Sequence, residues 1–98
     1  MLFAGVFTRR PNVSEASERR TLQLFTNWTP PDGFTFKANY AFADSTGGLF
    51  IAESTAEAMA EATGVWNPHF EFRVWPIVDA NAMVPTWQRV MAWRDGVR

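Results

Sequence analysis

The side chains best suited to chemistry in this chain are a histidine and a carboxylate two positions later. His69 is the single histidine. Imidazole has an ordinary pKa near neutrality, so His69 is a natural general base or haem ligand. Glu71 supplies a carboxylate that could also accept a proton. We therefore predict His69 and Glu71 as candidate catalytic residues, with a surface or hydrogen-bonding role as the alternative for His69.

Polar and aromatic side chains on two predicted strands are candidate ligand contacts. Strand alternation places Lys37 with Asn39, and Glu71 with Arg73, so that these side chains could form one polar cluster inside a cavity. A solvated or interfacial salt-bridge network is the alternative. The guanidinium of Arg73 beside a tryptophan ring could bind an anionic or aromatic ligand. The candidate ligand-binding residues are Lys37, Asn39, Trp66, Arg73 and Trp75.

The composition excludes several functional classes. The chain has 98 residues, a net charge of −1 and no basic run longer than two arginines, so we expect one domain that does not bind nucleic acid. It contains no cysteine and one histidine, which argues against disulfides, a thiolate nucleophile and a conventional zinc site. We expect no metal and no cofactor. The apolar run at residues 1–7 precedes the first arginines and is too short to cross a bilayer, which predicts a cytoplasmic protein without membrane contact.

A β-hairpin at residues 34–54 organises the predicted fold. Two strand-like runs flank residues 44–48, where two glycines are expected to adopt the positive φ angles of a short hairpin loop. Alternation in the first run predicts an apolar row that helices must cover and a polar row that faces water, a ligand or a partner. The apolar row is Phe34, Phe36, Ala38, Tyr40 and Phe42, and the opposite row is Thr35, Lys37, Asn39, Ala41 and Ala43.

Two helices and two further strands surround this hairpin. An apolar strand at residues 1–8 suits the middle of a sheet, and a helix follows from an N-cap at Asn12 to about Asn27. A capping box at residues 54–57 begins the second helix. Its inner face is Thr55, Ala58, Met59, Ala62 and Trp66, of which the tryptophan is either a pocket flank or a core residue. The last strand, residues 70–78, contains Pro76 and is predicted at a sheet edge.

This order of elements predicts an α+β protein with the ferredoxin-like βαββαβ fold, in which two helices cover one face of a four-stranded antiparallel sheet. The domain spans residues 1–79, and residues 80–98 form a C-terminal helical extension with Pro85 in its first turn. The extension carries an apolar stripe at Met83, Trp87, Val90 and Met91. The second sheet face would hold too much apolar surface to stay exposed. We expect a second copy of the chain or the C-terminal extension to cover it.

The opening Met1-Leu2-Phe3, the turn Pro30-Pro31-Asp32-Gly33, the segment 44–53, Trp66 and the segment 72–79 follow a known pattern. They resemble a bacterial family of small uncharacterised proteins placed in the dimeric α+β barrel superfamily, and the resemblance covers residues 1–79. It implies a homodimer. Members of the superfamily include cofactor-free monooxygenases, haem-degrading enzymes, isomerases, chlorite dismutases and ligand-sensing domains. Haem-degrading members combine an Asn on the first strand with a Trp and a His near the second helix, and residues 2–8 contain no Asn.

These patterns predict a homodimer whose sheet face holds a cavity for a small, partly apolar molecule. If the protein is an enzyme, the resemblance implies cofactor-independent oxygenation or isomerisation, with His69 or Glu71 handling the proton. The alternative is a non-catalytic structural or interaction module. In that case residues 83–94, which include Trp87 and Trp93, would contact a protein partner.

Overall fold

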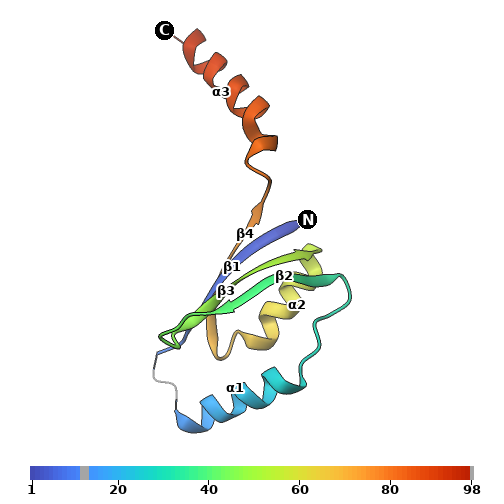
Figure 1. Cartoon of the computed structure of the whole chain (residues 1–98), viewed down its shortest axis with the longest axis vertical. Coiled ribbons are helices and arrows are strands. Elements are labelled where there is room, and N and C mark those ends of the chain that lie inside the picture. Colours follow the sequence, from blue (N-terminus) through green and yellow to red (C-terminus); the bar gives the residue numbers. More distant parts are fainter. Residues whose placement is uncertain (12–13, 98) are drawn as a thin grey trace.

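The computed structural model describes residues 1–11 and 14–97 and shows the predicted element order followed by a C-terminal helix (Figure 1). The α+β ferredoxin-like βαββαβ fold is therefore confirmed. In chain order the elements are β1 (Leu2–Arg9), α1 (Glu15–Asn27), β2 (Phe34–Ala41), β3 (Gly47–Ser54), α2 (Ala56–Trp66), β4 (Phe70–Ile77), the 3₁₀ turn η1 (Asn81–Met83) and α3 (Val84–Gly96).

The four strands form one antiparallel sheet in the order β2-β3-β1-β4. The first strand is central and the last, which contains Pro76, is at an edge, as the sequence predicts. Helices α1 and α2 lie on the same face of the sheet (Figure 1). Neither of these two helices covers the other face of the sheet.

The core lies between α2 and the sheet. Small side chains on the helix, Ala58 and Ala62, let it lie close to the strands, and Trp66 closes its far end. The predicted inner face of α2 is confirmed except for Thr55, which is exposed because it caps the helix. The buried apolar residues are Phe3, Phe34, Phe50, Ala52, Ala58, Met59, Ala62 and Trp66.

Both helices on the sheet begin at a side-chain cap. In α2 the capping residue is Thr55, whose Oγ1 accepts from the Ala58 N–H at 3.0 Å, one position later than predicted. Ser54 is buried instead, and its hydroxyl donates to the Thr55 carbonyl. In α1 the cap is Ser14, whose Oγ accepts from the Ser17 N–H at 3.1 Å. The predicted cap at Asn12 lies outside the described residues.

A β-bulge in β2 overturns the predicted alternation. Phe36 pairs with Ala52 and Ala38 pairs with Ile51, so Lys37 is an extra residue without a cross-strand partner. One inserted residue exchanges the two faces for every residue that follows it. Asn39, opposite the buried Phe50, therefore lies on the helix-covered face. Tyr40 lies on the other face and is 64% exposed.

Both hairpin glycines are required for close approach, and Gly47 also has the predicted positive φ, at 159°, whereas Gly48 does not. Ser45 is the loop residue in the left-handed region, with φ of 65°. A Cβ built on Gly47 would lie 1.9 Å from the Phe7 carbonyl oxygen, and one on Gly48 would lie 2.2 Å from the Tyr40 carbonyl oxygen. Both positions are therefore closed to any side chain by the neighbouring strands.

The sheet face opposite the helices carries apolar side chains on all four strands, together with the polar or charged residues Thr8, Thr35, Glu53, Glu71 and Arg73. We define the open face by its apolar side chains, which the strand register places together: Leu2, Ala4, Val6, Ala38, Tyr40, Leu49, Ile51, Trp75 and Ile77. Trp75, on the edge strand β4, is 50% exposed. Helix α3 does not cover this face within the chain, because it projects beyond the sheet (Figure 1). The prediction that the chain's own C-terminal extension covers this face is therefore wrong, and a second copy of the chain is the other predicted cover.

Replacing Gly48 with alanine tests the close approach of the strands. We expect Gly48→Ala to lower the free energy of unfolding by about 1–3 kcal/mol, because the clashing atom is a carbonyl oxygen of the neighbouring strand. Gly64→Ala is the matched control. It has nothing within 4 Å of its added Cβ and should be neutral or raise stability by up to about 1 kcal/mol. Equal urea midpoints for the two variants would contradict the close approach.

Asp44 predicts a pH dependence of stability. The side-chain hydroxyl of Thr46, 2.7 Å from Oδ1, and then the Thr46 N–H hold the pKa of Asp44 below its ordinary value. The ionised form thus favours the folded state above the ordinary pKa, and this contribution disappears as the pH falls through the lowered value. We expect Asp44→Asn to destabilise at pH 7, with the difference shrinking as the pH falls through the lowered pKa of Asp44. Urea unfolding of both proteins at neutral and at acidic pH measures this difference, and a difference that does not change with pH would contradict the role of the ionised carboxylate.

Candidate functional site: an aromatic cleft beneath α1

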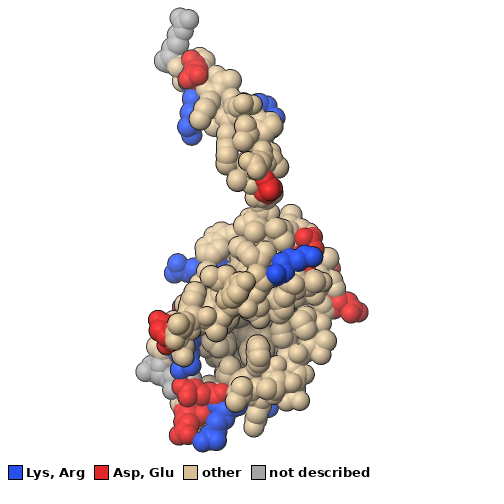
Figure 2. All heavy atoms as spheres, in the orientation of Figure 1, with Lys and Arg blue, Asp and Glu red and all other residues tan. Residues whose placement is uncertain are grey.

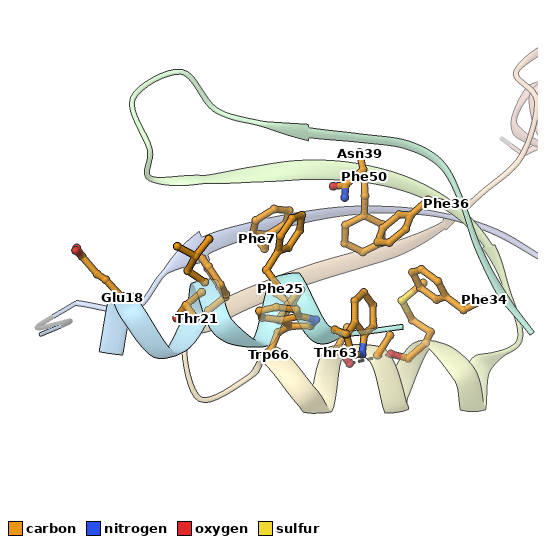
Figure 3. Close-up of a pocket in the computed structure, with 16 residues that line it drawn as sticks. Phe7, Glu18, Thr21, Phe25, Phe34, Phe36, Asn39, Phe50, Thr63 and Trp66 are labelled. Carbon is orange, nitrogen blue, oxygen red and sulfur yellow. Dashed lines mark hydrogen bonds between the residues drawn. The ribbon is translucent and has the colours of Figure 1, made fainter. Parts of the chain in front are cut away.

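A cleft of about 300 Å³ lies between α1, α2 and the helix-covered face of the sheet. In Figure 2 the body of the molecule is hollowed in a region of uncharged residues. Nine of the sixteen lining residues are aromatic: Phe7, Phe25, Trp28, Phe34, Phe36, Phe50, Trp66, Phe70 and Phe72 (Figure 3). Pockets for small molecules share this concave, mostly apolar character.

The cleft exists because α1 stands away from the sheet. No residue in the described part of α1 is buried, whereas α2 buries four. Leu22 and Phe25 line the cleft, yet they are 64% and 61% exposed because water reaches them through its opening. Exposed large apolar side chains on a concave wall are costly unless another surface covers them.

Contacts between aromatic rings hold the walls in place. Trp66 packs edge-on against Trp28, with ring centroids 5.5 Å apart, and joins the ends of the two helices. Phe34 and Phe36 meet edge-on at 4.8 Å, and Phe7 meets Phe70 at 5.3 Å. Each such pair adds about 0.5–1.5 kcal/mol beyond the area that it buries. The rings therefore form a preformed wall.

Most polar groups in the cleft wall have partners within the chain. The hydroxyls of Thr21 and Thr63 donate to carbonyls of their own helices, at 2.9 and 3.0 Å. The Glu18 carboxylate accepts from the Arg9 guanidinium at 2.8 Å. Asn39 is exposed at the cleft, and among the described residues its side-chain amide has no hydrogen-bond partner. Figure 3 shows it beside Phe50, on the cleft side of the sheet. It can donate and accept.

His69 lies next to the cleft and fastens α1. Its Nδ1 is 3.3 Å from the Ser17 hydroxyl in the first turn of α1. The backbone N–H of His69 donates to the Trp66 carbonyl, and the backbone carbonyl of His69 accepts from the Arg10 backbone N–H. His69 is half-buried and is not part of the cleft wall. The geometry gives it a role in joining α1 to the turn before β4.

The predicted catalytic and ligand-binding residues are spread over different surfaces. Asn39 and Trp66 line the cleft. Glu71 is exposed, with its carboxylate 3.7 Å from the Arg10 guanidinium. Lys37 is exposed at the bulge. Arg73 and Trp75 pair with Val6 and Ala4 and lie on the side of the open face. The predicted cluster of Lys37, Asn39, Glu71 and Arg73 on one face is therefore not formed.

The sequence predicted the place of only some rings of the cleft, and Trp66 was predicted as either a pocket flank or a core residue. Alternation does place Phe34 and Phe36 on the helix-facing side. It contains no signal for the gap left by α1, because Leu22 and Phe25 have the same spacing in a helix that packs tightly. Asn39 was predicted as a ligand contact, but on the opposite face of the sheet, since the bulge that turns it toward the cleft has no clear sequence mark.

The described residues include no group of three or more histidine, cysteine, aspartate or glutamate side chains placed to hold a metal ion. In the same part of the chain, no helix has both the length and the apolar character needed to cross a membrane.

The fold and the cleft define a small α+β protein of ferredoxin-like topology with an aromatic cleft between one helix and the sheet. Residues 1–91 match the family model of DUF3303, a domain of unknown function, and the chain belongs to this family. The match extends beyond Asp79 into α3, so the family region is longer than the predicted 1–79. No curated protein and no solved structure matches the sequence.

His69 provides a test of the fastening role. We expect His69→Ala to lower the free energy of unfolding by about 0.5–1.5 kcal/mol, since it removes one side-chain hydrogen bond. Affinity for ligands of the cleft should not change, because the imidazole is not in the cleft wall. Urea unfolding and calorimetric titration measure the two effects. Unchanged stability with lost binding would instead give His69 a direct part in the site.

Proposed function

We propose that this protein binds a small, mostly aromatic molecule carrying one hydrogen-bonding group in the cleft beneath α1. The supporting observation is the Asn39 amide, which has no partner among the described residues and lies in a wall built mainly of rings. Sites for small molecules combine apolar walls with a few polar groups that fix orientation. Rings of the ligand would stack against Phe7, Phe25 or Trp66, and its polar group would meet Asn39.

The size of the cleft sets the expected ligand. A volume of about 300 Å³ is at the lower end of the usual range for ligand pockets and suits a molecule of one or two fused rings. Removing about 400 Å² of apolar surface from water, counted on ligand and wall together, gains about 10 kcal/mol. Association costs at least about 4 kcal/mol, so the net corresponds to a Kd of tens of micromolar.

The geometry supports binding better than catalysis. Cofactor-independent oxygenation or isomerisation would need a proton-handling group at the ligand, and His69 and Glu71 are not in the cleft wall. Glu18 is the one ionisable side chain among the described lining residues, and its carboxylate forms an ion pair with Arg9. A binding role needs neither residue.

We also propose a homodimer in which the open face packs against the same face of a second copy, as in the dimeric α+β barrel superfamily that residues 1–79 resemble. The support is the apolar composition of that face, with Trp75 and Tyr40 exposed upon it. Aromatic residues are enriched in the cores of protein interfaces. Glu71 and Arg73 on β4 carry opposite charges, which a two-fold axis could bring together.

Paired ligands test the proposed site. We expect 2-naphthol to bind the wild-type protein more tightly than naphthalene does, because its hydroxyl can bond to Asn39. Asn39→Ala should weaken the binding of 2-naphthol by about 2- to 10-fold and leave the affinity for naphthalene unchanged, since one neutral hydrogen bond contributes about 0.5–1.5 kcal/mol. Titration by tryptophan fluorescence measures both affinities. If Asn39→Ala affects the two ligands equally, the amide does not contact the ligand.

A steric variant locates both ligands in the cleft. Ala62 lines the cleft, so Ala62→Leu should weaken 2-naphthol and naphthalene together. Ala60 is exposed on the same helix, and Ala60→Leu is the matched control that should leave both affinities unchanged. Unchanged binding by Ala62→Leu would place the ligand elsewhere and overturn the proposed site.

A further inference from the structure

We propose that α3 is an arm that docks on a second copy of this chain and completes the dimer interface. This inference rests on the homodimer proposed above and assigns it a further contact. The arm is defined as residues 84–96 together with Val97.

Helix α3 carries more apolar surface than a free helix can keep in water. None of its described residues is buried. Trp93 is 72% exposed. The exposed large apolar residues of the arm are Val84, Trp87, Val90, Met91, Trp93 and Val97. A contiguous apolar surface of this kind on a soluble protein marks an interaction site.

The apolar residues of the arm occupy one half of the helix. At 3.6 residues per turn, Trp87 and Trp93 are about 120° apart, and the other apolar side chains lie between or beside them. Gln88 and Asp95 lie on the opposite half. The arm therefore has a broad apolar side with Trp87 near its middle and Trp93 at one margin, and tryptophan is enriched in interface cores.

In this conformation the arm does not pack its apolar side against the domain of its own chain. Its main contacts are with η1, the short turn that precedes it. The molecule is 60 Å long and 22 Å across its shortest dimension, and Figure 1 shows α3 extending along the long axis, away from the sheet. Its apolar side is thus presented to another molecule.

The area of the open face explains why a second copy is the partner. Four strands of eight residues cover about 26 by 19 Å, so two open faces bury about 1,000 Å² in total. Stable interfaces usually bury about 1,600 ± 400 Å². An arm about 20 Å long and 10 Å wide buries about 400 Å² with its docking surface. Two exchanged arms would therefore bring the interface to about 1,800 Å².

The charges of the arm agree with this partner. Arg94 has no ion-pair partner among the described residues and lies on the apolar side of α3, where a docking surface must accommodate it. Glu71 is exposed on the side of the open face, and its contact to Arg10 is long, at 3.7 Å. A second copy therefore offers a carboxylate at the margin of the surface that the arm would reach.

Light scattering on the full-length chain between 5 and 200 μM tests the arm. We expect a wild-type dimer, and we expect Trp87→Glu and Trp93→Glu each to raise the dimer Kd at least tenfold. Gln88→Glu is the matched control, because it adds the same charge on the polar half of the same helix. Its Kd should stay within twofold of the wild-type value. The main contacts of α3 are with η1 and not with the sheet, so these variants should still fold.

Amide hydrogen exchange provides the second measurement. In the wild-type dimer, the amides of α3 should exchange at least tenfold more slowly than in dilute monomer. A dimer whose α3 amides exchange as in the monomer, with all variants keeping the wild-type Kd, overturns the arm and leaves the sheet-to-sheet homodimer standing. A wild-type monomer throughout the range overturns both, and the ligand titrations of the cleft are unaffected by that result.

Discussion

The constraint that governs this molecule is a sheet that is apolar on both faces. The central strand β1 directs Phe3 and Phe7 toward the helices and Leu2, Ala4 and Val6 the other way. Apolar surface must leave water to stabilise a fold, and two helices can cover only one face of a four-stranded sheet. The cover is complete beneath α2, partial beneath α1 and absent on the open face within the chain. The candidate sites lie where the cover is incomplete.

The cleft is the result of partial cover on the helix side. Its walls are aromatic rings in edge-on contact, which resist collapse because their positions are fixed by one another. Helix α2 lies close to the sheet because its inner face carries alanines. Helix α1 is joined to the domain mainly at its ends, by the His69–Ser17 contact and by the Trp28 ring. A wall of this kind is preformed, and the proposed ligand would meet it with the Asn39 amide as the polar contact.

The open face and α3 present a second uncovered surface that differs from the cleft. The cleft is concave and small, which suits a small molecule. The open face is broad, and the arm is a helix with tryptophans on its apolar side. Broad apolar surfaces bury area efficiently only against another protein surface. The molecule thus combines a ligand-sized site on one side of its sheet with a protein-sized surface on the other.

The sequence by itself determined the type and order of the elements. Alternation, capping residues and Pro76 predicted the strands, the start of α3, the central place of β1 and the edge position of β4. These features follow from local backbone preferences and from the period of the apolar pattern. The rings of the helix-facing rows were identified as well, because their burial depends on the same period.

Only the tertiary structure decided where the candidate site lies. The bulge at Lys37 turned Asn39 into the cleft and Tyr40 out of it, because one extra residue reverses the alternation of a strand. The gap beneath α1 and the projection of α3 depend on how whole elements pack, and neither leaves a mark in the spacing of residues. For the same reason His69 and Glu71, close in sequence, have different surroundings: one fastens a helix and the other is exposed beside Arg10.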